Sequence, residues 1–140
     1  MRSTYEKKSD LINEAGVATL FGEKFGVTML KTSVHNSYDY SALVGDVTQG
    51  LVEIKCRTNK HDKYRDYLIS KQKVDIVIRE AENFGVKMWL VVRFTDGVYY
   101  RSISEVDMPL KTETGGRKDR NDARDIESVY LIPIRTFQKL

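Results

Sequence analysis

Apolar and polar residues follow two different periods along the chain. Apolar residues recur at helical spacing over residues 10–25 and again over residues 71–84. Gly26 and Gly85 follow these segments as typical helix ends, and Ser70 is suited to cap the second helix. The positions predicted to form the two buried helix faces are Leu11, Ile12, Ala15, Ala18, Phe21 and Phe25, then Val74, Val77, Ile78, Ala81 and Phe84.

Apolar runs of strand length between and after these helices predict a sheet. The expected strands cover residues 27–32, 39–47, 51–57, 88–94, 98–103 and 129–134. Residues 46–50 would connect the second and third strands as a hairpin, and Asp96-Gly97 would connect the fourth and fifth. Residues 67–69 form only a short apolar segment before the second helix.

The C-terminal part is more polar. Residues 111–125 are predicted to form a loop, and Pro133 restricts the last strand to an edge or an end of a sheet. The pattern predicts a single α/β domain over residues 1–140, which is long enough to bury a sizeable core. A hydrophobic content of 41% with 31% charged residues is typical of a globular protein.

Composition excludes several classes of protein. The single cysteine, Cys56, permits no intrachain disulfide and favours a reducing compartment. One cysteine and two histidines are too few for a structural zinc site. No apolar run approaches the ~20 residues of a membrane span, and the N-terminus leads into no signal-peptide core, so we expect a cytoplasmic protein. The net charge of +3 is too small to indicate nucleic-acid binding by itself.

The stretch Glu53-Ile54-Lys55 carries the most specific chemistry. On a strand, Glu53 and Lys55 point to one face, while Ile54 and its apolar neighbours point to the core. Asp39 precedes Glu53 by fourteen residues, on the preceding predicted strand. Two carboxylates and an amine placed in this way can hold a divalent cation and a water molecule for phosphodiester hydrolysis.

Each of these residues also has a simpler interpretation. Glu53 and Lys55 could be an exposed pair on a half-buried strand, because Glu-x-Lys is common in a chain this rich in charge. Asp46, in the predicted turn, is an alternative to Asp39. Glu14 falls within the apolar arc of the first helix, where it either reaches the metal site or pairs with a lysine or solvent.

Asp39 followed by Glu53-x-Lys55 on the next strand resembles the signature of the PD-(D/E)XK nuclease superfamily, with Tyr38 where that family has proline. The element order over residues 10–94 resembles its restriction-endonuclease-like α-β-β-β-α-β core, with an added hairpin and C-terminal strand. The resemblance implies a central mixed sheet flanked by helices. It implies a Mg²⁺ or Mn²⁺ ion held by Asp39, Glu53, the Ile54 carbonyl and Glu14, with Lys55 acting on the attacking water.

Basic residues downstream of this signature could bind DNA phosphates without reading sequence. The residues predicted to contact DNA are Arg57, Lys60, Lys71, Lys73 and, in the second polar loop, Arg117. Tyr64 and Tyr67 lie among them. The alternative is a solvated surface, since aspartates dilute the charge in both loops. His35 and His61 lack any motif for catalysis and are expected to be ordinary polar loop residues.

The sequence therefore predicts a magnesium-dependent DNA endonuclease with structure-directed or nonspecific cutting. The resemblance favours small phage-type nucleases and Holliday-junction resolvases, and a homodimer would supply the two sites needed for two cuts. A non-catalytic nucleic-acid-binding module on the same fold is the main alternative, and a protein-interaction domain is a third. The intact Asp39, Glu53 and Lys55 argue against both.

Overall fold

The computed structural model describes residues 8–33, 36–104, 111–116 and 126–140. In chain order its elements are α1 (Lys8–Phe25), β1 (Thr28–Lys31), β2 (Tyr40–Val44), β3 (Val47–Cys56), β4 (Asp66–Ser70), α2 (Lys71–Phe84), β5 (Lys87–Phe94), β6 (Gly97–Ile103), β7 (Lys111–Gly116), β8 (Ile126–Pro133), the 3₁₀ helix η5 (Ile134–Thr136) and β9 (Gln138–Lys139). The structure thus has the predicted α/β class.

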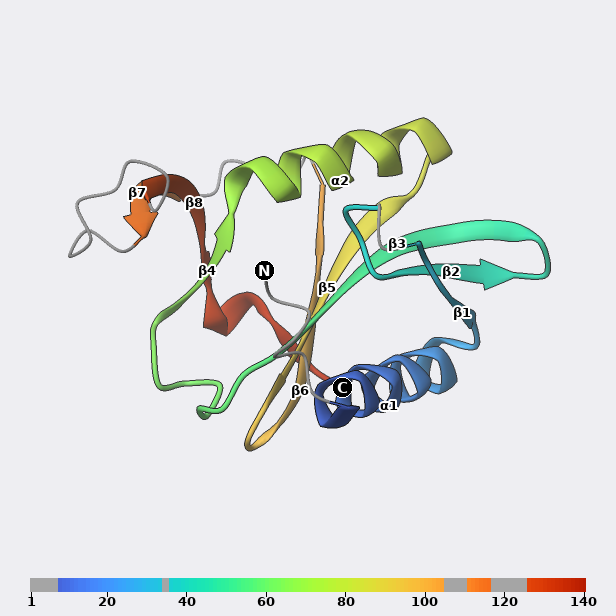
Figure 1. Ribbon diagram of the computed structural model, residues 1–140, viewed down its shortest axis with the longest axis horizontal. Coiled ribbons are helices and arrows are strands. Elements are labelled where there is room, and N and C mark those ends of the chain that lie inside the picture. The colour runs from blue at the N-terminus through green and yellow to red at the C-terminus, as the bar shows by residue number, and fades with distance from the viewer. Residues whose placement is uncertain (1–7, 34–35, 105–110, 117–125) are drawn as a thin grey trace.

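A six-stranded mixed sheet forms the centre of the molecule, in the order β1-β2-β3-β5-β6-β9. Strands β3 and β5 run parallel, whereas the other neighbouring pairs are antiparallel. Helices α1 and α2 cover opposite faces of this sheet (Figure 1). The predicted helix–sheet–helix arrangement, with β5–β6 as the added hairpin, is therefore confirmed.

Strand β3 has a core on each of its faces, as its alternation requires. On the α1 face, Val52 and Ile54 pack with Val17 and Phe21. On the α2 face, Leu51 packs with a cluster that includes the helix residues Val74, Val77, Ile78 and Ala81. Glu53 and Lys55 share the parity of Leu51, so they belong to the α2 face of the sheet.

A second sheet, of order β4-β8-β7, lies beside α2 (Figure 1) and was not predicted. The short apolar segment 67–69 is strand β4, because β8 supplies its hydrogen-bonding partner. Lys111–Gly116 is strand β7 rather than loop, since it pairs with the other edge of β8. Pro133 ends β8, as its missing N–H requires. Pairing between distant segments thus outweighs the polar composition of β7.

Several local boundaries also differ from the predicted ones. The first hairpin turns at Gly45-Asp46, so residues 47–50 belong to β3 rather than to a turn. Gly45 has φ of 60°, a conformation that glycine adopts without strain. Cys56, expected to pack inward, is exposed at the end of β3.

The predicted helix faces are correct in part. Ala18 and Phe21 of α1 and four of the five named residues of α2 are buried. Ala15, Phe25 and Phe84 are exposed, because the sheet covers a narrower arc of each helix than the apolar pattern suggested, and Val17 is buried instead. The side chains of Leu11 and Ile12 lie outside the described residues.

The caps of α2 follow from local chemistry. The Ser70 hydroxyl accepts a hydrogen bond from the Lys73 N–H at 3.4 Å, and Gly85 ends the helix with φ of 71°. No helix within the described ranges is long and apolar enough to cross a membrane.

Candidate active site

The β2–β3 hairpin places Asp39 beside Glu53. Tyr40 pairs with Val52 in the register, and the Asp39 N–H donates to the Val52 carbonyl at 3.0 Å. The Ile54 N–H in turn donates to Oδ2 of Asp39 at 2.8 Å. This second bond fixes the orientation of the Asp39 carboxylate at the open end of the hairpin.

Glu53 is the one charged residue in the core of the described chain, with 5% of its surface exposed. Burial raises the pKa of Glu53 to about 8, and a hydrogen bond with Asp39 and the negative charge of Asp39 act in the same direction. Lys55 and Lys73 oppose this rise without cancelling it. The surroundings of Glu53 therefore favour its protonated form at neutral pH.

Lys55 follows on the same face of β3. Its Nζ lies 3.6 Å from Oε2 of Glu53, and its side chain is more exposed than that of Glu53. The pair is neither the exposed surface pair of the simpler interpretation nor a fully enclosed one. Lys55 can reach solvent or a substrate while it contacts the buried acid.

Glu14 belongs to α1, which covers the other face of the sheet. Its carboxylate forms an ion pair with Lys31 of β1, and Lys31 also lies over the Tyr40 ring at 5.1 Å. Burial lowers the pKa of Lys31, but the hydrogen bond and charge of Glu14 outweigh it, with a smaller contribution from Asp39. Glu14 thus pairs with a lysine, as its simpler interpretation allowed, and the charge of Asp39 also acts on that lysine.

The alternative acid, Asp46, lies far from this group. It sits exposed in the turn at the closed end of the hairpin, seven residues before Glu53. Seven residues of strand span about 23 Å. The structure therefore brings Asp39, and not Asp46, to Glu53 and Lys55.

The two lysines in the first turn of α2 differ in their surroundings. Lys71 pairs with Asp75 at 2.7 Å, and Asp75 also accepts a hydrogen bond from the Tyr130 hydroxyl at 2.6 Å. Lys73 is exposed and acts electrostatically on Glu53. Of the two predicted phosphate contacts, Lys73 is the one directed toward the carboxylates.

The other predicted DNA contacts lie along the segment after β3. Arg57 is exposed and its guanidinium lies over the Tyr67 ring at 5.3 Å. Lys60 is exposed in the loop. Arg117 lies outside the described residues, as does His35.

His61 has a partner that sequence reasoning missed. The backbone N–H of His61 donates to Asp96 Oδ1 at 2.9 Å, and the ring Nδ1 lies 2.6 Å from Asp96 Oδ2. Its ring stacks on Tyr99 at a centroid distance of 4.3 Å. His61 and Asp96 form a group with Asp62, in which the ligand atoms lie within 4.8 Å of one another. In the sequence, Asp96-Gly97 indicated only a turn. No pattern in the sequence indicated that the loop with His61 would bind to this turn.

A mixed sheet between two helices, with paired acids and a lysine in the second half of the parallel pair β3–β5, defines the PD-(D/E)XK class of nucleases. The comparisons agree with this classification. The family model described as "Phage putative PDDEXK endonuclease" matches residues 1–140, so the chain belongs to this phage endonuclease family.

The fold also matches a solved structure. Hjc of Archaeoglobus fulgidus, a Holliday junction resolvase from an archaeal hyperthermophile, aligns with a TM-score of 0.58 at 12% identity. The alignment covers 91% of this chain and 92% of that one. At this identity the likeness shows the fold alone. No curated protein matches the chain in sequence.

Proposed function

We propose that the protein is a divalent-metal-dependent DNA endonuclease, with Asp39, Glu53 and Lys55 as its catalytic residues. The observation that carries this proposal is the carboxyl pair formed by buried Glu53 and half-buried Asp39. Asp39 and Glu53 lie side by side in a site where Glu53 has a pKa of about 8, next to Lys55 at 3.6 Å. Two acids kept this close are costly to a fold, which makes a role in chemistry the better explanation.

The donor set fits a hard divalent cation. Asp39 uses one carboxylate oxygen to accept from Ile54, which leaves the other for a ligand. Together with Glu53 and the Ile54 carbonyl it offers oxygen ligands only, which suits Mg²⁺ or Mn²⁺ rather than zinc. A bound divalent cation neutralises phosphate charge and lowers the pKa of a coordinated water. Its charge would also let both carboxyl groups ionise together.

The remaining steps fall to side chains of this chain. Lys55 orients the attacking water or stabilises negative charge on the phosphate, for which its partial exposure suits it. Lys73 holds a neighbouring phosphate at the N-terminus of α2, where backbone amides also favour anions. Direct attack by water leaves a 5′-phosphate and a 3′-hydroxyl, as the resemblance implies.

The choice of substrate follows from what the chain offers. The described elements are all used in the nuclease core and the small second sheet, with no separate element for reading base sequence. Structure-directed or nonspecific cutting is therefore the proposed mode, and the fold of a junction resolvase supports the first. A homodimer would bring two sites to one DNA molecule for paired cuts.

The test incubates the purified protein and Lys55→Ala with labelled duplex, single-stranded and four-way-junction DNA, with Mg²⁺, Mn²⁺ or EDTA. We expect cutting that requires the cation and disappears in the variant. Metal-independent binding of all three DNAs without cutting would overturn the proposal in favour of the non-catalytic binding module. Lys87→Ala is a matched control, since Lys87 is an exposed strand lysine at the far end of β5.

A further inference from the structure

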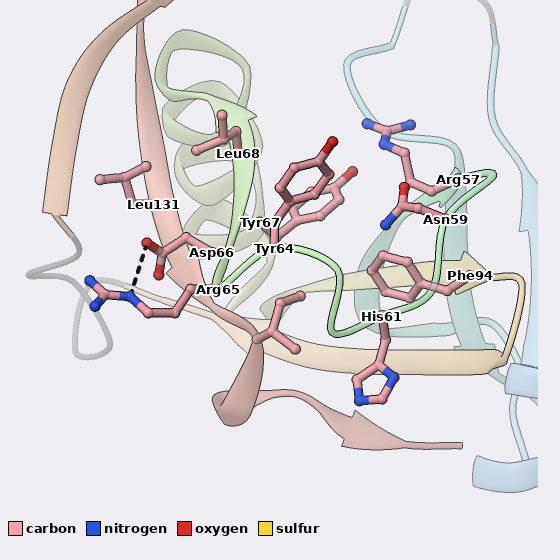
Figure 2. A pocket seen from close by; sticks show the side chains of 11 residues that line it. Arg57, Asn59, His61, Tyr64, Arg65, Asp66, Tyr67, Leu68, Phe94 and Leu131 are labelled. Atoms are coloured by element: carbon pink, nitrogen blue, oxygen red, sulfur yellow. Dashed lines mark ion pairs between the residues drawn. The ribbon is translucent and has the colours of Figure 1, made fainter.

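A pocket of about 630 Å³ lies between the segment after β3 and the second sheet, and Arg57, which directly follows β3, is among its lining residues. Its lining includes Arg57, Tyr64, Tyr67, Leu68, Phe94 and Leu131. In Figure 2 the two tyrosine rings lie between Leu68 and Leu131 on one side and Arg57 and Phe94 on the other. The pocket therefore has flat aromatic and aliphatic walls, with a cation at one side.

Positive charge accompanies both tyrosines. The Arg57 guanidinium lies 5.3 Å from the centroid of the Tyr67 ring, and the Lys63 ammonium lies 5.4 Å from that of Tyr64. Tyr64 is 60% exposed, which leaves ring surface available to a ligand. Aromatic faces bind a planar ring by stacking, and cations beside them bind phosphate, so the two together suit a nucleotide.

The Tyr67 hydroxyl is a second, independent feature. Tyr67 is 6% exposed, and its hydroxyl is buried without a hydrogen-bond partner among the described residues. A buried hydroxyl without a partner is costly. The edge of a nucleobase carries the donors and acceptors that would satisfy it.

The pocket is close enough to the carboxylates to share a substrate with them. Arg57 follows Lys55 by two residues, about 7 Å of extended backbone. Burial raises the pKa of Tyr67 to about 12, and the charges of Arg57 and Glu53 act on the same hydroxyl in opposite directions. A nucleotide in the pocket would thus lie near the phosphate that the cation of Asp39 and Glu53 would bind.

We propose that this pocket receives one unstacked nucleobase of the DNA, next to the phosphate that is cut. The proposal rests on the proposed function and assigns its specificity. A paired duplex keeps its base faces stacked, so only an unpaired or extruded base can lie against the exposed ring of Tyr64. The enzyme would then prefer junctions, bulges and flaps to continuous duplex.

The test measures the contribution of one base. Two duplexes carry a single-nucleotide bulge at the same position, one with thymine and one with an abasic tetrahydrofuran. Binding of the full chain is measured by fluorescence anisotropy in EDTA, where the substrate is not cut. We expect the thymine bulge to bind about tenfold more tightly, equivalent to about 1.4 kcal/mol. Tyr64→Ala should bring the ratio of the two affinities close to one, and Tyr64→Phe should keep it.

A second measurement uses 2-aminopurine as the bulged base, because stacking on an aromatic ring quenches its fluorescence. Quenching on binding that is lost in Tyr64→Ala would support the proposal. Equal affinity for both bulges, or a ratio that Tyr64→Ala leaves unchanged, would overturn the base-pocket proposal. Normal binding of the duplex in the same experiment would leave the nuclease proposal standing. Failure to bind any of these DNAs would overturn the base-pocket proposal, and the cutting assay would decide the nuclease proposal separately.

Discussion

Two groups of acidic residues in this protein have opposite surroundings. Glu53 lies in the core beside Asp39, and burial with that neighbour raises the pKa of Glu53 to about 8. Asp96 lies exposed in the β5–β6 turn, where a hydrogen bond from His61 holds the pKa of Asp96 below its ordinary value. The surroundings of Glu53 disfavour its ionised form, whereas those of Asp96 favour it.

Side chains that lie close enough to bind a metal ion do not all have the same need for one. The ligand atoms of His61, Asp62 and Asp96 lie within 4.8 Å of one another, which is close enough for a metal ion. The Asp96 carboxylate is already hydrogen-bonded to the loop that it holds, however, and so gains less from a cation. The Asp39–Glu53 pair lacks enough positive charge to ionise fully, which makes it the group that a divalent cation would stabilise most.

The largest expected effect comes from exchanging a carboxylate for an amide in each group. Glu53→Gln should reduce Mg²⁺-dependent cutting of DNA about 100-fold or more, because it removes a cation ligand at the reacting phosphate. Asp96→Asn should leave cutting within about twofold of the parent, because Asp96 serves the loop. Initial rates on one labelled substrate at saturating Mg²⁺ measure both.

The reverse result would assign the metal to the surface group and would refute the comparison. Both variants should be checked for native circular dichroism first. Asp62→Asn is a further control, because Asp62 belongs to the same surface group.

The next effect concerns stability and pH. An ordinary glutamate has a pKa of 4.5, so the unfolded chain has released a proton that native Glu53 keeps up to about pH 8. The native state binds more protons across this window, and the free energy of unfolding therefore falls as pH rises from about 5 to 8. Glu53→Gln should remove that fall and exceed the parent in stability by on the order of 4 kcal/mol at pH 8.5.

Urea unfolding in EDTA between pH 5 and 9 measures this difference. Asp96→Asn is the control, because an acid with a lowered pKa loses its stabilising effect only below its ordinary value of 3.8, outside the window. Parallel pH profiles for the parent and Glu53→Gln would mean that Glu53 is ionised in the native protein.

Strand alternation made the grouping of Asp39, Glu53 and Lys55 predictable. Glu53, Ile54 and Lys55 needed only the period of a strand to fall on their faces, and the hairpin needed only its two apolar runs to bring Asp39 alongside. These are local relations, and they survived an error of several residues in the turn.

The surroundings of the site depended on distant pairings that no local pattern encodes. Strand β4 exists because β8 pairs with it some sixty residues later, and the Tyr67 pocket exists because of that pairing. Asp96 meets His61 across thirty-five residues of sequence. Lys31 meets Glu14 because α1 packs back on β1, so the helix pattern could indicate an inward glutamate but not its partner.

A third test concerns Glu14, which is held by Lys31. If Glu14 serves the cation, Glu14→Gln should raise the Mg²⁺ concentration needed for half-maximal cutting about tenfold. Lys31→Gln should lower it, because it releases the Glu14 carboxylate. Glu23→Gln, an exposed acid on the same helix, is the matched control and should change nothing. No movement of the Mg²⁺ midpoint in either Glu14→Gln or Lys31→Gln would leave Glu14 as a structural ion pair only.

The smallest effect repeats the opening comparison with cations. Lys71 is already neutralised by Asp75 at 2.7 Å, whereas Lys73 in the same helical turn is exposed and directed toward the buried acids. Each phosphate contact contributes about 0.9 to the slope of log affinity against log salt. Lys73→Gln should therefore lower that slope by about one and weaken duplex binding about threefold near 0.2 M salt, while Lys71→Gln should leave the slope unchanged. Titrations from 50 to 200 mM salt in EDTA measure both. A slope lowered equally in the two variants would mean that the ion pair with Asp75 opens when DNA binds, and an unaltered slope in both would place the DNA elsewhere.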